Sequence, residues 1–154
     1  MTEGEKTTEK LTEILKRTRP SQAGRILDEN SEHLVPAEGA FSEYVRGVFK
    51  RKGLSRQSAF IAAGIPERYG YKLLSGEKIT HKRDVLLRLF LAAGFELEEV
   101  RRALKLYGLP ELYPRFPRDA VLMIAINSRM RDPYEVDELL AKHGFEPLSP
   151  CGEE

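Results

Sequence analysis

Hydrophobic residues along this chain recur every three to four positions, which is the spacing of a helix with one buried face. The stripe is clearest in residues 41–53, where the apolar positions are Phe41, Tyr44, Val45, Val48 and Phe49. The same spacing predicts further helices over residues 8–18, 21–34, 56–64, 66–76, 84–94, 95–108, 117–130 and 133–144. We identify no convincing strand and no internal repeat, so the sequence predicts an all-α fold.

Capping residues set the predicted ends of these helices. Ser55 is a good N-cap for residues 56–64, and Pro66 suits the first position of the next helix because its missing N–H needs no partner there. Asp132 precedes Pro133 and Glu135, which predicts a capping box at the start of the last helix. Glycine would end the helices that precede Gly53, Gly64, Gly76, Gly94 and Gly108.

The predicted elements group into regions along the chain. We expect an N-terminal helical extension (residues 1–38), a core domain of five helices (39–108), a C-terminal helical pair packed on that core (109–146) and a flexible tail (147–154). Residues 35–40 contain proline and glycine and would link the first two regions. Residues 120–126, "AVLMIAI", are more apolar than a one-sided surface helix requires, so they either pack on the core or form a dimer surface.

Composition fits a packed, cytoplasmic protein. The 154 residues are 41% hydrophobic and 32% charged, which allows a core and disfavours wholesale disorder. The single cysteine, Cys151, excludes an internal disulfide and suits a reducing compartment. No apolar run approaches the roughly 18–20 residues of a membrane span, and the polar N-terminus lacks the apolar core of a signal peptide. We therefore expect a cytoplasmic location and no membrane partner.

Charge is distributed unevenly although the net charge is only +1. Lys and Arg against Asp and Glu number 6 against 8 in residues 1–40, 11 against 4 in residues 41–90, and 8 against 12 in residues 91–154. A basic middle between acidic flanks indicates a surface that faces a polyanion. Ordinary clustering of surface charge would give the same pattern, so the charge by itself does not decide the function.

No group of side chains suggests catalysis or metal binding. His33, His81 and His143 are far apart and share no metal-ligand spacing, and one cysteine adds no local site. The adjacent Glu98 and Glu99 point in different directions on a predicted helix, so they make a poor acid–base pair. We expect no enzymatic activity, no catalytic residues, no metal and no cofactor.

Residues 53–78, "GLSRQSAFIAAGIPERYGYKLLSGEK", predict two short helices joined by a tight turn. An isolated helix below roughly 12–15 residues is only marginally stable in water, so such a pair forms where tertiary packing holds it. In a helix-turn-helix, that packing holds the second helix outward for the DNA major groove. One predicted face of the second helix would pack on the core and carries Tyr69, Gly70, Leu73 and Leu74. The opposite face carries Glu67, Arg68, Tyr71, Lys72 and Ser75.

The exposed face has the chemistry of DNA recognition. Arg68 could donate a fork of hydrogen bonds to guanine, and Lys72 could reach a base or a phosphate. The polar residues expected to contact phosphates are Arg56, Gln57, Ser75, Lys78, Lys82 and Arg83. The alternative is that Arg68 and Lys72 are ordinary solvated cations, and that Tyr69 and Tyr71 are core residues with a hydrated hydroxyl.

Residues 41–100 resemble the Cro/lambda-repressor-type helix-turn-helix domain of the XRE family of bacterial regulators. The matching stretches are "GLSRQSAFIAAGI", the "SGEK" that ends the second helix, and "LLRLFLAAGFELEEV". The resemblance implies a five-helix, lambda-repressor-like core in which the third helix enters the major groove. It places the base-reading positions on Glu67, Arg68, Tyr71 and Lys72, and the phosphate-facing glutamine on Arg56 or Gln57.

Three further stretches resemble a subgroup of this family that has a C-terminal helical extension and is often encoded near protein kinases. They are "RYGYKLLSGEK", "ELYPRFPRDAVLMIAI" and "ELLAKHGFEPL". The chain departs from the family at Gly70, where an aliphatic residue is usual, and at residues 74–75, where Glu-Asn is usual. Because glycine destabilises a helix interior by about 1 kcal/mol, we expect a looser second helix, with Tyr69 or Tyr71 filling the space beside Gly70.

The sequence leaves two functions open. The first is a sequence-specific DNA-binding transcriptional regulator that uses residues 66–75 as its recognition helix on double-stranded DNA, commonly as a homodimer. The second is an interaction or adaptor module of a signalling or defence system, whose protein partner would be a kinase or another regulator. The near-neutral net charge, the acidic Glu67 and the additional helices at both ends favour the second function.

Overall fold

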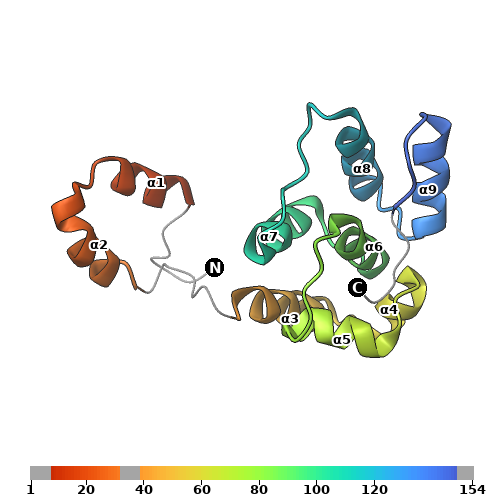
Figure 1. Cartoon of the computed structure of the whole chain (residues 1–154), viewed down its shortest axis with the longest axis horizontal. Coiled ribbons are helices and arrows are strands. Elements are labelled where there is room, and N and C mark those ends of the chain that lie inside the picture. The colour runs from red at the N-terminus through yellow and green to blue at the C-terminus, as the bar shows by residue number, and fades with distance from the viewer. Residues whose placement is uncertain (1–7, 32–38, 149–154) are drawn as a thin grey trace. The chain divides into compact units, whose positions relative to one another are not determined.

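A computed structural model of the chain describes residues 8–31 and 39–148 (Figure 1). All regular elements in these residues are helices, which confirms the all-α prediction. The chain divides into two compact units, residues 1–37 and 38–154. Within the described ranges, none of the helices combines the length and the apolar character needed to cross a membrane. His33, Cys151 and most of the predicted linker lie outside the described residues.

The first unit contains α1 (Thr8–Lys16), a short 3-10 helix (Pro20–Gln22) and α2 (Ala23–Glu29). The helix predicted over residues 21–34 ends at Glu29 as far as the structure describes it, and the Asn30 side chain donates to the carbonyl oxygen of Ile26 at 2.9 Å. Leu27 is 53% exposed, and neither α1 nor α2 contains a buried residue. The two helices therefore form no hydrophobic core of their own.

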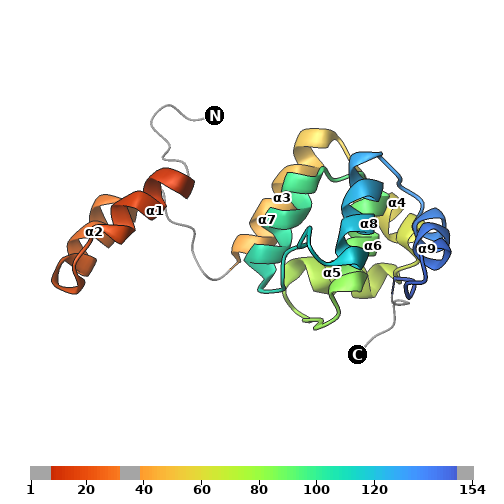
Figure 2. The same cartoon turned by 90° about the horizontal axis from the view of Figure 1, so that it is seen from above.

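The second unit contains seven α-helices within residues 39–148. They are α3 (Ala40–Lys52), α4 (Arg56–Ala63), α5 (Glu67–Ser75), α6 (Arg83–Ala93), α7 (Leu97–Tyr107), α8 (Pro117–Asn127) and α9 (Pro133–Lys142). In Figure 1, α3, α4 and α5 lie along the lower edge, α8 and α9 along the upper edge, and α6 and α7 between them. Figure 2 shows α3 and α7 side by side, and these two helices contact each other. The predicted glycines end α3 to α7, each with the positive φ that glycine adopts without strain.

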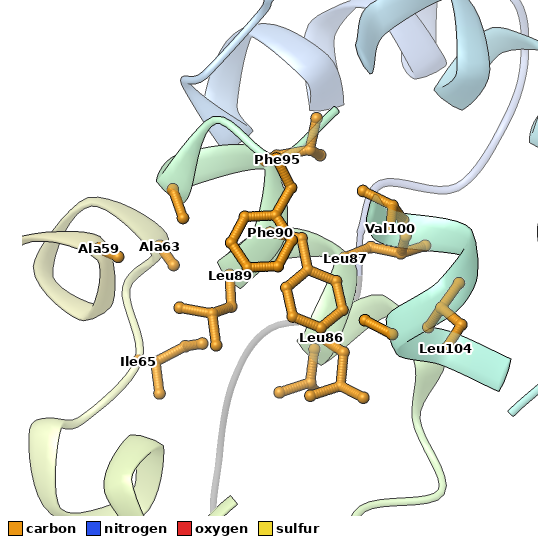
Figure 3. Close-up of a cluster of buried hydrophobic side chains, with 14 of the residues drawn as sticks. Ala59, Ala63, Ile65, Leu86, Leu87, Leu89, Phe90, Phe95, Val100 and Leu104 are labelled. Atoms are coloured by element: carbon orange, nitrogen blue, oxygen red, sulfur yellow. The ribbon is translucent and has the colours of Figure 1, made fainter. Parts of the chain in front are cut away.

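Helix α6 is the centre of the core. Its residues from Val85 to Leu91 are all buried, so it is covered on every side instead of along one stripe. Figure 3 shows the side chains of α6 meeting those of α4 and α7, among them Ala59, Ala63, Leu89, Phe90, Val100 and Leu104. The Phe90 ring stacks on Phe95 with 4.8 Å between centroids and 12° between planes.

The helix pairs α6–α7 and α8–α9 are an internal repeat, so the prediction of no repeat is wrong. The dipeptide Arg83–Asp84 that opens the first copy recurs as Arg118–Asp119 in the second. Other identical pairs are Leu87 and Leu122, Glu99 and Glu135, Val100 and Val136, Leu104 and Leu140, Gly108 and Gly144, and Leu112 and Leu148. Helix α6 contacts α9 and helix α7 contacts α8, as an approximate two-fold relation between the copies requires. One inserted residue before Asp132 shifts the register and obscures the match in the sequence.

The turns inside the two copies have matching backbone conformations. Gly94 ends α6 at φ +75°, and Arg129 follows α8 at φ +61°. The N–H of Phe95 donates to the carbonyl oxygen of Phe90 at 3.0 Å, and the N–H of Met130 donates to that of Ala125 at 3.1 Å. Both are the six-residue hydrogen bond of a Schellman motif. Arg129 is the one non-glycine residue in the described ranges with a positive φ.

Two reciprocal arginine–aspartate pairs join the copies at the first turns of α6 and α8. Arg83 donates to both carboxylate oxygens of Asp119 at 3.2 and 2.6 Å. Arg118 donates to both oxygens of Asp84 at 3.2 and 3.0 Å. Each guanidinium also donates to two carbonyl oxygens beyond the second helix of its own copy, which are those of Pro110 and Glu111 for Arg83 and those of Glu146 and Pro147 for Arg118.

The C-terminal helices belong to the same unit as the predicted five-helix core. Packing extends to Leu148, into the region predicted as a flexible tail: Leu148 is 1% exposed and its N–H donates to Asp137 at 2.8 Å. The rest of that region, residues 149–154, lies outside the described residues. In the apolar stretch 120–126, Leu122, Ala125 and Ile126 are buried while Ile124 is exposed. Burial within the unit therefore accounts for most of that stretch.

Glu99 ties the start of α7 to the end of α3. Its buried carboxylate lies 2.7 Å from Arg51 and 2.6 Å from Lys52, and it also accepts the backbone N–H of Glu96 at 2.8 Å. Burial acts to raise the pKa of Glu99, but the hydrogen bonds from Lys52, Glu96 and Arg51 outweigh burial and hold the pKa below its usual value.

We expect Glu99→Gln to lower the free energy of unfolding at neutral pH by about 1–3 kcal/mol, because two cations lose a charged partner. The folded pKa lies below the unfolded value of about 4.3. The contribution of Glu99 to the free energy of unfolding is therefore fully present above the unfolded pKa, and it is lost as the pH falls through the folded pKa. Urea unfolding of parent and variant across this range measures it, with the exposed neighbour Glu98→Gln as control. A loss that is equal in acid and at neutral pH would contradict the assignment.

We also expect the buried arginine–aspartate pairs to contribute to the free energy of unfolding. Asp119 is 3% exposed and also accepts the N–H of Tyr113 at 2.9 Å, so Asp119→Asn should cost about 2–4 kcal/mol of unfolding free energy. The matched surface pair is Arg101–Glu111 at 3.7 Å, with side chains 36% and 40% exposed. Glu111→Gln should change the same quantity by less than about 1 kcal/mol. Chemical denaturation of both variants compares them, and similar losses would show that the buried pair is not a structural link.

Candidate nucleic-acid interface

Helices α4 and α5 pack against each other and are joined by the turn at residues 64–66. The Ser55 hydroxyl accepts the N–H of Ser58 at 3.2 Å, which confirms Ser55 as the N-cap of α4. Pro66, predicted as the first helical residue of α5, is instead its N-cap, and the helix begins at Glu67. Asp132 caps α9 as predicted by accepting the N–H of Tyr134 at 2.9 Å, but the predicted capping box with Glu135 is not formed.

The two faces of α5 are divided as the sequence predicted. Tyr69, Gly70, Leu73 and Leu74 are buried in the core. On the other face, Glu67, Arg68, Tyr71 and Ser75 are exposed, and Lys72 is half-buried. Tyr69 is 1% exposed whereas Tyr71 is 39% exposed, so only the second tyrosine has an accessible ring.

Gly70 of α5 lies directly against Phe60 of α4. A Cβ at this position would lie 2.5–2.8 Å from three ring atoms of Phe60, which is fully buried in α4. Tyr71 packs edge-on against the same ring from the outside, with 5.0 Å between centroids. The space beside Gly70 is therefore filled by Phe60, and not by Tyr69 or Tyr71 as the sequence suggested. Helix α5 runs without interruption through the glycine.

A basic cleft of about 240 Å³ lies between α3 and α5. Its cations are Arg46 of α3, Arg56 of α4 and Lys72 of α5, and its rim also carries the acidic Glu77. The Arg56 guanidinium lies 5.6 Å from the centroid of the Tyr71 ring, so the ring holds Arg56 against α5. Arg46 was not predicted from the sequence, because the pattern of polar residues in α3 does not indicate which helix Arg46 would face.

Gln57 and Glu67 lie together at the start of α5. The amide nitrogen of Gln57 is 3.4 Å from a carboxylate oxygen of Glu67, which is a long hydrogen bond between exposed groups. Arg68 follows on the same turn, and within the described ranges no carboxylate lies within ion-pair distance of it. Glu67 therefore contacts Gln57 of α4 and does not pair with Arg68, so the guanidinium of Arg68 can bind a ligand.

The basic residues after α5 differ in their surroundings. The Lys78 ammonium lies 6.0 Å from the centroid of the Tyr69 ring, and Lys82 is exposed. Arg83 differs from both because its guanidinium is held by Asp119 and its side chain is only 20% exposed. Arg83 is thus a residue predicted to contact phosphate whose charge is instead held by a carboxylate within the fold.

All but one of the eleven cations in residues 41–90 fall into two groups, the exception being Lys50, which is exposed on α3. One group is paired with acids from residues 91–154 and comprises Arg51, Lys52, Arg83 and Arg88. The other group lies on the α3–α5 surface and the following loop and comprises Arg46, Arg56, Arg68, Lys72, Lys78 and Lys82. We call this second group the α3–α5 basic surface. Folding removes part of the positive charge from the middle segment and leaves the rest concentrated around α5.

Comparison with known proteins adds no assignment to this geometry. No protein-family model matches the chain, and neither the curated proteins nor the solved structures contain a match. In the part of the chain that the structure describes, no three His, Cys, Asp or Glu side chains are grouped so that they could hold a metal ion.

The contact at Gly70 can be tested by two matched glycine substitutions. Gly70→Ala should lower the free energy of unfolding by about 1–2 kcal/mol, because the clash with Phe60 outweighs the gain of about 1 kcal/mol in helix propensity. Gly47 in α3 has no atom within 4 Å of its Cβ position, so Gly47→Ala should raise the same quantity by up to about 1 kcal/mol.

Thermal and urea unfolding measure both variants. Adding Phe60→Leu to Gly70→Ala should cost less than the two separate changes combined, because the smaller side chain removes the clash. If Gly70→Ala stabilised the protein as Gly47→Ala does, the close approach of α4 and α5 would be refuted.

Proposed function

We propose that the protein is a transcriptional regulator that binds double-stranded DNA sequence-specifically, with α5 as the recognition helix in the major groove. The observation that carries the proposal is the division of α5 into a buried face and an outward face with Arg68, Tyr71 and Lys72. A helix held in this way can enter a groove about 12 Å wide without losing its packing. Such a division of faces is what a recognition helix of the Cro/lambda-repressor type, which the sequence resembles, would need.

Base recognition would come from the outward side chains of α5. Arg68 would donate two hydrogen bonds to the O6 and N7 atoms of guanine, and Lys72 would reach a base or a phosphate beside it. Glu67 would accept a hydrogen bond from the N4 amino group of cytosine. Its carboxylate is negatively charged and would be repelled by phosphates, so a base is the only part of DNA that it could bind. Tyr71 supplies an accessible hydroxyl and ring edge next to both cations.

Phosphate contacts would come from the α3–α5 basic surface. Arg56 and Gln57 lie in the first turn of α4, where the backbone N–H groups and the helix dipole also favour an anion. Arg46 lines the same cleft as Arg56 and Lys72, and we add it to the phosphate set with Ser75, Lys78 and Lys82. Arg83 is left out because Asp119 holds it. The Arg56–Tyr71 contact would fix the distance between the phosphate-binding and base-reading residues.

A specific observation favours the second candidate, a protein-interaction module. Ile61 on the outer side of α4 is 72% exposed, and Ile79 in the loop after α5 is 65% exposed. Two exposed isoleucines close to the same helix pair would suit an apolar contact with a protein partner. Such a contact would depend little on salt, whereas binding through 6–10 phosphates weakens by about 10³–10⁵ between 50 and 200 mM salt.

The deciding experiment is selection from a random double-stranded DNA library at about 150 mM salt, where non-specific binding is weak. We expect the parent protein to enrich one motif, and Arg68→Ala/Lys72→Ala to lose that enrichment because its base contacts are removed. Arg46→Ala should weaken binding to all sequences alike, since a phosphate contact carries no sequence information. If the protein acts as a homodimer, the motif will be two half-sites about 34 Å apart, one helical turn.

Arg115→Ala/Lys142→Ala is the matched control, because it removes two exposed cations far from α5 in sequence and outside the α3–α5 basic surface. It should select the same motif as the parent. Circular dichroism of each variant verifies folding. A well-folded parent that enriches no sequence would refute DNA reading and favour a protein partner. Retention of the motif by the Arg68→Ala/Lys72→Ala protein would refute α5 as the recognition helix.

A further inference from the structure

The outward side of α8 differs from that of the neighbouring helices because it carries no charge. Within Pro117–Asn127 the charged side chains are Arg118 and Asp119, and both take part in the reciprocal arginine–aspartate pairs. The other residues from Phe116 to Ser128 that are not buried are all uncharged. The exposed sides of α7 and α9 carry charged residues instead, namely Glu98, Arg102, Lys105, Glu135, Glu138 and Lys142. Helix α8 therefore presents an uncharged face in a chain that is 32% charged.

The internal repeat shows what covers the equivalent face in the first copy. Val121 and Ile124 of α8 correspond to Leu86 and Leu89 of α6, which are both 0% exposed. Helix α4 packs along α6, and Figure 3 shows Leu89 beside Ala63 at the end of α4. In the second copy Val121 is only half-buried and Ile124 is 61% exposed. The outward face of α8 is thus one on which a helix packs in the other copy.

Large and small residues alternate along this face. Phe116, Ala120, Ile124 and Ser128 follow one another at intervals of four residues, so they form one row along the helix, which we call the α8 row. The two large residues, Phe116 and Ile124, are 60% and 61% exposed. In the opposite direction the row reads small, large, small, large. Two α8 rows that run antiparallel would therefore place each large side chain against a small one.

We propose that the outward face of α8 is a contact between two copies of this chain, whose α8 helices pack antiparallel across a two-fold axis. Ile124 of each copy lies against Ala120 of the partner subunit, and Phe116 lies against Ser128 of the partner subunit. The absence of charge suits a symmetric contact, because a charged residue near a two-fold axis lies close to its own copy and is repelled by it. A partner with a charged surface would find no complementary charge on this face.

The size of the face sets the strength of the contact. Helix α8 has 11 residues, and a helix of that length is about 16 Å long and about 10 Å wide. A face of this size buries less than the roughly 800 Å² per partner of a standard interface. The exposed rings of Tyr113 and Phe116, with centroids 4.9 Å apart, extend the apolar surface at one end. We therefore expect a weak dimer in reversible exchange with the monomer.

This contact is separate from the proposed DNA binding. Figure 1 shows α8 and α5 at opposite edges of the second unit, so the α8 contact would not place two α5 helices on adjacent half-sites. Two copies on adjacent half-sites would need a contact of their own near α5. The α8 contact can therefore be tested without DNA, and its failure would leave the assignment of the recognition helix unchanged.

The experiment is sedimentation velocity of the full chain at concentrations from about 10 μM to about 1 mM, the range of weak affinities. We expect an equilibrium between monomer and dimer. Ile124→Glu should weaken dimerisation at least about tenfold, because the contact would then bury a carboxylate that has no partner. Ile61→Glu is the matched control, since Ile61 is a 72% exposed isoleucine on α4, and it should leave the equilibrium unchanged.

An exchange of the two facing residues tests the antiparallel pairing. Ile124→Ala should weaken dimerisation at least about threefold, because two small residues then face each other and leave a cavity. Ala120→Ile should weaken it by a similar factor, because two large residues then overlap. The double variant Ala120→Ile/Ile124→Ala again has a large residue against a small one, so it should regain most of the parent affinity. Circular dichroism and urea unfolding verify that each variant is folded.

Four outcomes would overturn the proposal. A monomer at every concentration would show that the α8 face does not bind a second copy and would favour a different protein as its partner. Loss of the dimer in Ile61→Glu, but not in Ile124→Glu, would place the contact on α4. A dimer that survives both changes would place the contact elsewhere in the chain. A double variant that dimerises no better than the two single variants would refute the antiparallel pairing.

Discussion

The second unit depends on covering α6 on every side. A helix that is apolar around its whole circumference cannot be buried by a single layer, so helices from both parts of the chain must contact it. Helix α4 and helix α7 cover it from one part and α9 from the other. Arg88, within α6, donates to the carbonyl oxygen of Ala63 at the end of α4 at 3.0 Å and lies 3.5 Å from Asp137 of α9. The C-terminal helices therefore complete the core, and are not an extension attached to a finished domain.

The repeat explains how one supersecondary unit performs different tasks in the two copies. Residues that maintain the relation between the copies are identical, as in the Arg83–Asp119 and Arg118–Asp84 pairs. Residues that face other partners have diverged: the position of the buried Arg88 is Met123 in the second copy. Residues are identical in the two copies where the copies contact each other, and they differ where each copy contacts other parts of the unit.

The sequence predicted what local physics determines. Helical periodicity, the N-caps at Ser55 and Asp132 and the glycine ends of α3 to α7 each depend on neighbours within a few residues, and all are present in the structure. Features set by distant residues were missed or misplaced. The reason for Gly70 is the ring of Phe60 on another helix, and Arg46 faces a cleft that only tertiary packing creates. Arg83 is paired with an aspartate of α8, on the far side of α7 in the sequence. The division of the α5 faces was predictable because a helix that is buried on one side carries its apolar residues at helical spacing.

Net charge is a poor guide to the partner of this protein, because folding sorts the charges. The acidic C-terminal region pairs with the cations that serve the fold: Glu99 with Arg51 and Lys52, Asp119 with Arg83, and Asp137 with Arg88. Within residues 41–90, these pairs leave the α3–α5 basic surface and Lys50 of α3 as the remaining positive charge. Since exposed charges act over a Debye length of about 8 Å at physiological salt, a ligand at that surface is influenced by the local cations far more than by the total of +1. A near-neutral chain can therefore present a basic face. The acids of residues 91–154 determine which cations of residues 41–90 are paired and which stay on that face.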